Sequence, residues 1–73
     1  MQEEGRRILS LMADGADRSF DVLQIMTGVE PKALRAALDG LREAGLLEHK
    51  YARDTESFVI TLRGFILHHD SVF

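Results

Sequence analysis

Residues 27–49, TGVEPKALRAALDGLREAGLLEH, decide the fold of this chain. Pro31 suits the first turn of a helix, where its missing N–H is not needed, and Gly45 suits the position just past a helix end. Between them, apolar side chains recur at the i, i+3, i+4 and i+7 spacing of one buried stripe: Leu34, Ala37, Leu38 and Leu41. The stretch predicts an amphipathic helix over about residues 31–44, preceded by a turn at Gly28.

Two further apolar patterns lie before this helix. Helical spacing predicts a first helix over about residues 2–14, built on Ile8, Leu9, Leu11 and Met12 and ended by Gly15. Residues 17–19 are expected to form a connection, and Ser19 is a suitable N-cap for a short helix over about residues 20–27. The core candidates of that short helix are Phe20, Val22, Leu23 and Met26.

Beyond Gly45 the pattern changes to strands. Residues 46–51 and 58–62 have strand character, and the polar stretch 52–57 between them predicts the connector of a hairpin. A short terminal helix is expected over about residues 62–70, with Thr61 as its N-cap, although Gly64 costs about 1 kcal/mol inside a helix. The predicted fold class is mainly α with a small β-hairpin, in one domain over residues 1–73.

Composition limits the function. The 73 residues carry nine basic and twelve acidic side chains, a net charge of -3, and no cysteine. Disulfides, thiolate zinc sites and thiol nucleophiles are therefore excluded. The negative charge also argues against a nonspecific nucleic-acid binder, whose affinity depends on a strong positive field, but not against a sequence-specific one. No apolar run approaches the roughly 18 to 20 residues that cross a bilayer, so a soluble cytoplasmic protein is expected.

Histidine and serine offer little chemistry. His68 and His69 are adjacent, so on a helix their side chains point about 100° apart and cannot easily share a metal ion. The serines have no base and orienting group nearby in the sequence, and no glycine-rich phosphate loop is present. We expect no metal, no cofactor and no enzymatic activity.

The order of these elements resembles that of a winged helix-turn-helix domain of the type found in small prokaryotic or phage transcriptional regulators. SFDVLQIMTG (19–28) is similar to the first helix of the motif, VEPKALRAALDGLREAGLL (29–47) to the recognition helix and its exit, and EHKYARDTESFVITLRG (48–64) to the wing and the start of a terminal helix. The resemblance implies double-stranded DNA as the partner, with helix 31–44 in the major groove and the wing, residues 46–62, alongside.

Carried over by position, the resemblance implies a DNA-binding set of Lys32, Arg35, Ala36, Lys50 and Arg53. Lysine and arginine donate to guanine acceptors or to phosphate, and the wing would reach the backbone or the minor groove. The helix departs from the family pattern in two acidic positions: Glu30 stands at the helix start, and Asp39 lies four residues after Arg35 and can pair with it. The DNA-binding hypothesis requires the four cations to converge on one ridge.

A second hypothesis is a winged-helix module that binds protein and not DNA. Balanced charge on helix 31–44 favours it, as do the apolar residues at 65–67 and 72–73. In either case a homodimer through the first helix and the C-terminal segment is expected, because one core of this size supplies only about 3–5 kcal/mol.

A flank of small residues on helix 31–44 allows close approach. It comprises Ala33, Ala36, Ala37, Gly40 and Ala44. Either the short helix 20–27 packs there, or the flank forms the wall of a groove or a second protein approaches over Ala36 and Gly40.

Overall fold

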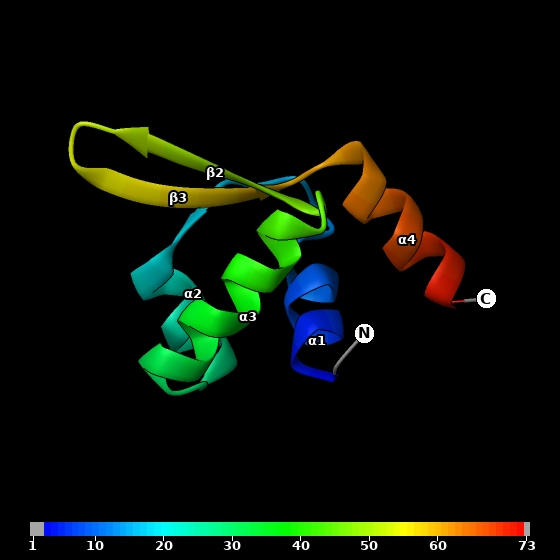
Figure 1. Ribbon diagram of the computed structural model, residues 1–73, viewed down its shortest axis with the longest axis horizontal. Coiled ribbons are helices and arrows are strands. Elements are labelled where there is room, and N and C mark those ends of the chain that lie inside the picture. Colours follow the sequence, from blue (N-terminus) through cyan, green and yellow to red (C-terminus); the bar gives the residue numbers. More distant parts are fainter. Residues whose placement is uncertain (1–2, 73) are drawn as a thin grey trace.

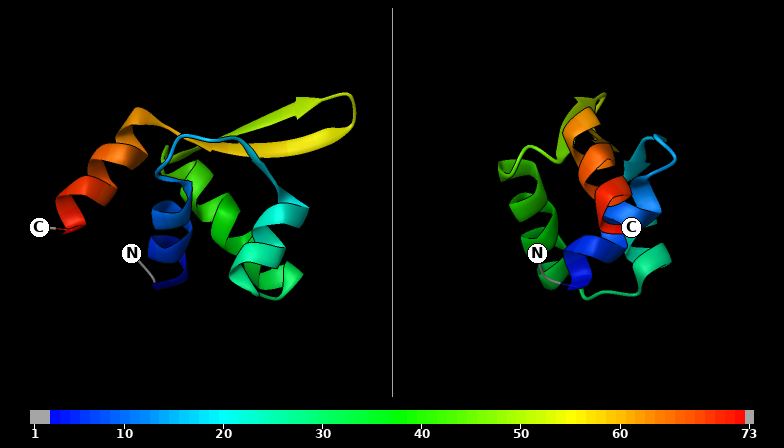
Figure 2. Two further views of the ribbon diagram at one scale, coloured as in Figure 1. Left: turned by 180° about the vertical axis from the view of Figure 1, so that it is seen from behind. Right: turned by 90° about the vertical axis from the view of Figure 1, so that its right-hand side faces the viewer.

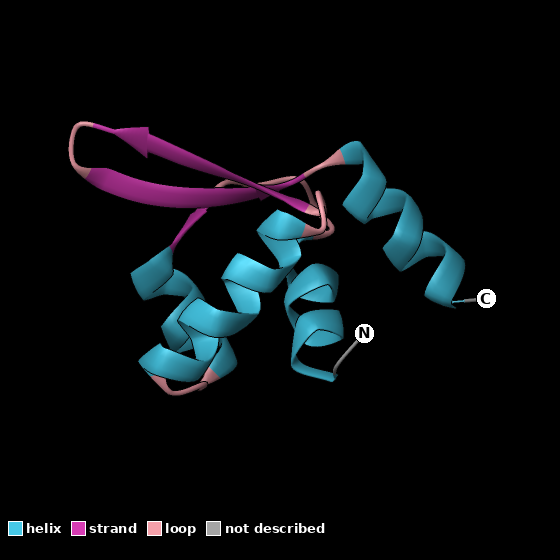
Figure 3. Cartoon of the chain, in the orientation of Figure 1, coloured by secondary structure: helices cyan, strands magenta, loops and turns pink. Residues whose placement is uncertain are grey.

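A computed structural model describes residues 3–72, with side chains up to residue 70. Helices and a β-hairpin follow one another in the order shown in Figure 1 and, coloured by type, in Figure 3. The elements are α1 (Glu3–Met12), β1 (Arg18–Ser19), α2 (Phe20–Thr27), α3 (Pro31–Glu43), β2 (Leu47–Ala52), β3 (Thr55–Ile60) and α4 (Leu62–Val72). The predicted fold class, mainly α with a small hairpin, is confirmed.

The core is a single apolar cluster between the helices and the base of the hairpin. Its buried members are Ile8, Leu9, Met12, Leu23, Leu34, Leu38, Leu41, Leu46, Leu47 and Phe58. The stripe expected on α3 is found, with three buried leucines and Ala37 packed against the cluster. Helices α1, α2 and α3 therefore each contribute through one face.

The short helix α2 faces the core differently from the prediction. Leu23 is fully buried and Phe20 packs against the core, but Val22 and Met26 are 42% and 49% exposed. An eight-residue helix can turn only one narrow stripe inward, and here the stripe runs through Phe20 and Leu23. Val22 and Met26, four residues apart, share the outward side, so their assignment to the core was wrong.

The sheet has a third strand that the sequence did not reveal. Strand β1 pairs antiparallel with β3, with Arg18 opposite Phe58 and Ser19 opposite Ser57, and the strand order is β1-β3-β2. Residues 17–19 were expected to be only a connection, because two residues of strand show no alternation. Ser19 has the predicted capping role as well, since its Oγ accepts a hydrogen bond from the Val22 N–H at 3.2 Å.

The hairpin turn is much tighter than expected. The strands extend to Ala52 and resume at Thr55, which are paired with each other. The turn consists of Arg53 and Asp54, with φ values of 51° and 66°. Two consecutive positive φ values match the twist of a two-residue hairpin, and aspartate tolerates this region. Most of the polar stretch 52–57 is therefore strand. Its polarity fits a hairpin that projects from the body and can be polar on both faces.

Helix α4 is anchored at the exit of α3. The Thr61 hydroxyl donates to the Gly45 carbonyl at 2.7 Å and accepts from the Gly64 N–H at 3.0 Å, so Thr61 caps α4 as predicted. A Cβ on Gly64 would overlap the Leu46 carbonyl oxygen and lie 3.0 Å from Ile60 Cγ1. Glycine at this helical position is thus required by a close approach of two backbones.

The elements form a body with two projections. The hairpin extends from one end of the helical body and α4 lies at the other, with α1 between α3 and α4 in Figure 1 and from behind in Figure 2. Within residues 3–72, no helix combines the length and the apolar character that a membrane span requires.

Candidate nucleic-acid interface

Helix α3 presents a mixed outer face. Its first residues, Pro31 and Lys32, are exposed, as are Ala36 and Gly40 further along. Glu30 stands at the N-cap position, but its side chain makes no capping hydrogen bond. The start of α3 thus leaves Lys32 in solvent, on the half of the helix that the resemblance assigns to DNA.

Arg35 is held by the hairpin. Its Nη1 and Nη2 donate to the two Glu56 carboxylate oxygens at 2.8 and 2.7 Å, and its guanidinium carbon lies 4.4 Å from the centre of the Phe20 ring. The expected exposed pair with Asp39 does not form, and Asp39 lies 3.9 Å from Arg42 instead. A bidentate pair with a largely buried carboxylate outcompetes an exposed pair along the helix.

Glu56 accepts from three side chains. Besides Arg35, His49 Nε2 lies 2.8 Å and the Tyr51 hydroxyl 3.2 Å from Glu56 Oε2. The Arg35 hydrogen bonds lower the pKa of Glu56 to about 2, against the opposing effect of burial, and the carboxylate raises the pKa of Arg35. We call Phe20, Arg35, His49, Tyr51 and Glu56 the Glu56 junction.

The aromatic rings complete the junction. The His49 ring stacks on Phe58, with centroids 4.8 Å apart, and meets the edge of Tyr51 at 4.6 Å. Because Glu56 is ionised, the His49 nitrogen that faces it acts as the donor. The histidine therefore links the core to the polar cluster.

The predicted DNA-binding residues are divided between α3 and the hairpin. The charge of Arg35 is paired within the junction, and Lys50 lies between His49 and Tyr51 in strand β2. Since successive side chains in a strand point to opposite faces, Lys50 projects away from the junction. Arg53 lies at the hairpin turn. The four predicted cations therefore come from two elements, α3 and the wing, and one of them, Arg35, is paired with Glu56.

The sequence did not predict that His49, Tyr51 and Glu56 lie together with Arg35. His49 and Tyr51 are two residues apart in β2, and Tyr51 is opposite Glu56 in the register. The alternation was visible in the sequence, but the register depends on the two-residue turn, which was placed too broadly. A longer connector would have shifted Glu56 off its strand.

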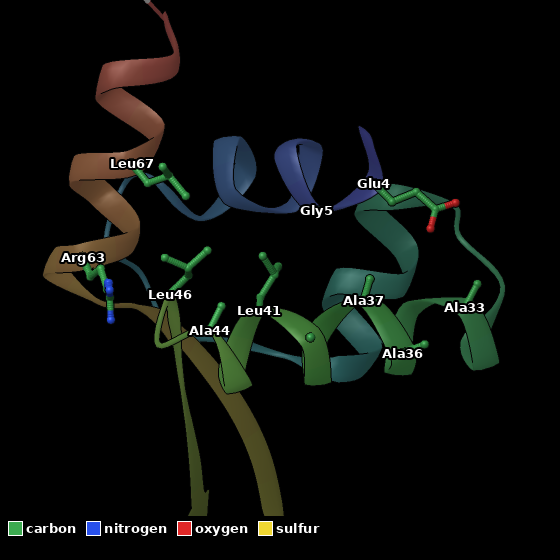
Figure 4. A pocket seen from close by; sticks show the side chains of 11 residues that line it. Glu4, Gly5, Ala33, Ala36, Ala37, Leu41, Ala44, Leu46, Arg63 and Leu67 are labelled. Atoms are coloured by element: carbon green, nitrogen blue, oxygen red, sulfur yellow. The ribbon is translucent and has the colours of Figure 1, made fainter. Parts of the chain in front are cut away.

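The small-residue flank of α3 lines a groove of about 900 Å3. Figure 4 shows Arg63 and Leu67 from α4 at one end and Glu4 from α1 at the other. Ala33, Ala36, Ala37, Gly40 and Ala44 all line it, and no residue of α2 does. The groove-wall interpretation of the flank is therefore the one found, and Ala36 belongs to that wall.

Among the residues that the structure describes, no group of three or more histidine, cysteine, aspartate or glutamate side chains is arranged to hold a metal ion. His69 lies with its ring parallel to that of Phe65, at 6.4 Å between centroids.

Solved structures share this arrangement. BpsR from Bordetella bronchiseptica, whose DNA binding is regulated by 6-hydroxynicotinic acid, superposes with a TM-score of 0.92 at 18% identity, over 99% of this chain and 53% of its own. MarR from E. coli, in its oxidized form, gives 0.88 at 21% identity, over 97% and 52%. The transcriptional regulator BldR from Sulfolobus solfataricus gives 0.82 at 23% identity, over 92% and 50%.

The chain has the winged helix-turn-helix fold. In this fold α2 and α3 are the helix-turn-helix pair, α3 stands in the position of the recognition helix, and the β2–β3 hairpin forms the wing. The chain spans about half the length of these three structures. No protein-family model matches the sequence, and no curated protein does.

Proposed function

We propose that this winged helix is the DNA-binding part of a transcriptional regulator, with α3 in the major groove and the wing beside it. The observation that carries the proposal is the joining of an exposed recognition helix to the wing through the Glu56 junction, in a fold shared with BpsR and BldR. A helix and a wing in fixed relation can contact neighbouring parts of a duplex together. We infer a cytoplasmic location from this role.

The proposed contacts come from both elements. Lys32 and Ala36 are exposed on α3, while Lys50 and Arg53 are exposed on the wing. Arg35 has a 43% exposed side chain and uses two of its N–H groups on Glu56, so its remaining donors can reach a phosphate. The alanine would admit a thymine methyl group or a close backbone.

Lys32→Ala tests the recognition helix, and Arg42→Ala is its matched control. Both positions are exposed on α3, at opposite ends, and each substitution removes one positive charge. A pool of genomic duplex fragments is first passed over wild-type protein at low salt. The fragment that wild type retains is then the probe for both variants. We expect K32A to bind that fragment more weakly and to lower the salt slope by about 0.9, the value of one phosphate contact. Equal affinities of K32A and R42A would remove α3 from the proposed site.

We also propose a homodimer through α1 and α4. Apolar side chains of α4 are exposed, with Phe65, Ile66 and Leu67 at 45%, 49% and 39%. Residue 73 and the side chain of residue 72, the rest of the expected apolar tail, lie outside the described part. Sedimentation at micromolar concentration should show a dimer that Ile66→Asp dissociates, and a wild-type monomer would reject this assembly.

A protein-binding module is the second candidate, favoured by the pairing of Arg35 within the chain. With that charge neutralised, little positive charge is left on α3, and the groove offers an apolar surface. If no genomic fragment is retained at low salt and a stoichiometric protein partner is captured, this candidate replaces the regulator.

A further inference from the structure

The hydrogen bonds between the recognition helix and the wing converge on a single carboxylate. Among the described residues, both hydrogen bonds between α3 and the strands of the hairpin run from Arg35 to Glu56. The same carboxylate accepts from His49 and Tyr51 on the neighbouring strand. Glu56 thus connects α3, β2 and β3, and Phe20 of α2 supports the arginine from the other side.

This position is unusual for a negative charge beside a proposed DNA surface. A free carboxylate there would repel phosphate, and its removal would be expected to strengthen binding. Glu56, however, has only 17% of its side chain exposed, and its charge is matched by Arg35. Its effect on DNA must then be exerted through the placement of other groups.

The contacts also indicate what happens when phosphate approaches. A phosphate that took Arg35 away would leave a largely buried carboxylate with only His49 and Tyr51 as donors. Desolvated charges that lose a partner are costly, whereas the outer donors of Arg35 are accessible while the Glu56 pair stays intact. Retention of the pair is therefore favoured over exchange.

We propose that Glu56 is a positioning residue for DNA recognition: it sets the wing against the recognition helix and keeps Arg35 in the bound complex as well as in the free protein. The role of Arg35 is then to hold the wing and to present its outer edge to phosphate, and not to read a base. The DNA part of this inference rests on the proposed function, but the order of the wing does not.

Glu56→Gln is the test, with Glu48→Gln as the matched control. Glu48 is exposed on β2, opposite Val59, and both substitutions remove one negative charge from the wing. Without DNA, amide hydrogen exchange over residues 47–60 should be faster in E56Q than in E48Q. Equal exchange in the two variants would overturn the proposal, whether or not the protein binds DNA.

DNA binding provides the second measurement, with the genomic fragment retained by wild-type protein as the probe. E56Q should bind at least about tenfold more weakly than E48Q, because a mobile wing must be ordered on binding. Hydroxyl-radical footprints should lose protection at the wing and keep it at the recognition helix. Tighter binding by E56Q than by E48Q would show that the carboxylate only repels DNA, and would overturn the proposal. Failure of wild-type protein to retain any fragment would remove the proposed function, leaving hydrogen exchange to decide the role of Glu56.

Tyr51 reports the state of the junction directly, because it is the only tyrosine of the chain. Its ring NMR signals should shift in E56Q and stay near their free-protein positions when wild-type protein binds DNA. A shift on DNA binding to the E56Q positions would mean that phosphate displaces the carboxylate, contrary to the proposal. If E56Q does not fold, Arg35→Lys serves instead, since it keeps the positive charge but loses the bidentate geometry and should also loosen the wing.

Discussion

The same substitution at two helical glycines should have opposite effects on stability. Gly40 lies on the exposed side of α3, and an added Cβ there meets nothing within 4 Å. Gly64 is buried in the first turn of α4, where an added Cβ would overlap the Leu46 carbonyl oxygen and lie 3.0 Å from Ile60 Cγ1. Both residues have helical backbone, so helix propensity favours alanine equally at both.

The contacts fix the expected magnitudes. Gly40→Ala should stabilise the protein by about 0.5–1 kcal/mol, the propensity difference in a helix. Gly64→Ala gains the same amount but must push α4 off a backbone atom, and overpacking of this kind costs about 1–3 kcal/mol or more. Since backbone cannot move aside as a flexible side chain can, we expect net destabilisation of about 2 kcal/mol, or a fall in Tm of roughly 8–16 °C for a domain of this size.

Urea and thermal unfolding followed by circular dichroism measure both variants. Gly40→Ala serves as the control, since it reports the propensity gain without a clash. A G64A variant as stable as G40A would refute the close approach of α4 to Leu46, and with it the account of why glycine stands inside this helix.

Two other predictions concern the junction and the cap of α2. The pKa of Glu56 is lowered to about 2 when folded, so its contribution to the free energy of unfolding is complete above about pH 4.5 and is lost as pH falls toward 2. In urea titrations at pH 7, the free energy of unfolding of wild type should exceed that of E56Q by about 1–2 kcal/mol, after solvent screening of the half-exposed Arg35. This difference should vanish near pH 2. A difference that stays constant with pH would contradict the pairing of Glu56 with Arg35. Ser19→Ala should cost about 1 kcal/mol through loss of the bond to the Val22 N–H, whereas Ser10→Ala, on the exposed side of α1, should not; equal stabilities would argue against the cap.

The parts of the fold that sequence predicted well depend on local periodicity. The stripe on α3 and its exit at Gly45, which has a φ of 76°, follow from spacing and from the conformational freedom of glycine. Val22 and Met26 went wrong because α2 is too short for spacing to distinguish one apolar side from the other. In a longer helix, the repeated positions of the polar residues would have shown which apolar side faces solvent.

The candidate site was harder to predict because its central contact spans 21 positions in the sequence. Arg35 had an obvious local partner in Asp39, and local pairs are the ones that helical spacing reveals. Its actual partner, Glu56, is decided by strand register, and register depends on whether residues 53 and 54 alone form the turn. An error in the predicted turn length was therefore enough to leave the contact between Arg35 and Glu56 unpredicted.

The junction bears on how an acidic chain would carry out the proposed DNA recognition. Nonspecific affinity depends on unpaired cations, and pairing Arg35 with Glu56 lowers their number on the recognition helix. In the proposed role, the same pairing would order the wing before DNA arrives and so reduce the entropy lost on binding. A rigid surface gains its contacts only where the shape of the duplex fits it. Weak nonspecific attraction combined with such a preorganised surface therefore favours discrimination between sequences over tight binding to all of them. The net charge of -3 is thus compatible with a selective DNA-binding domain and incompatible with one that depends on charge alone.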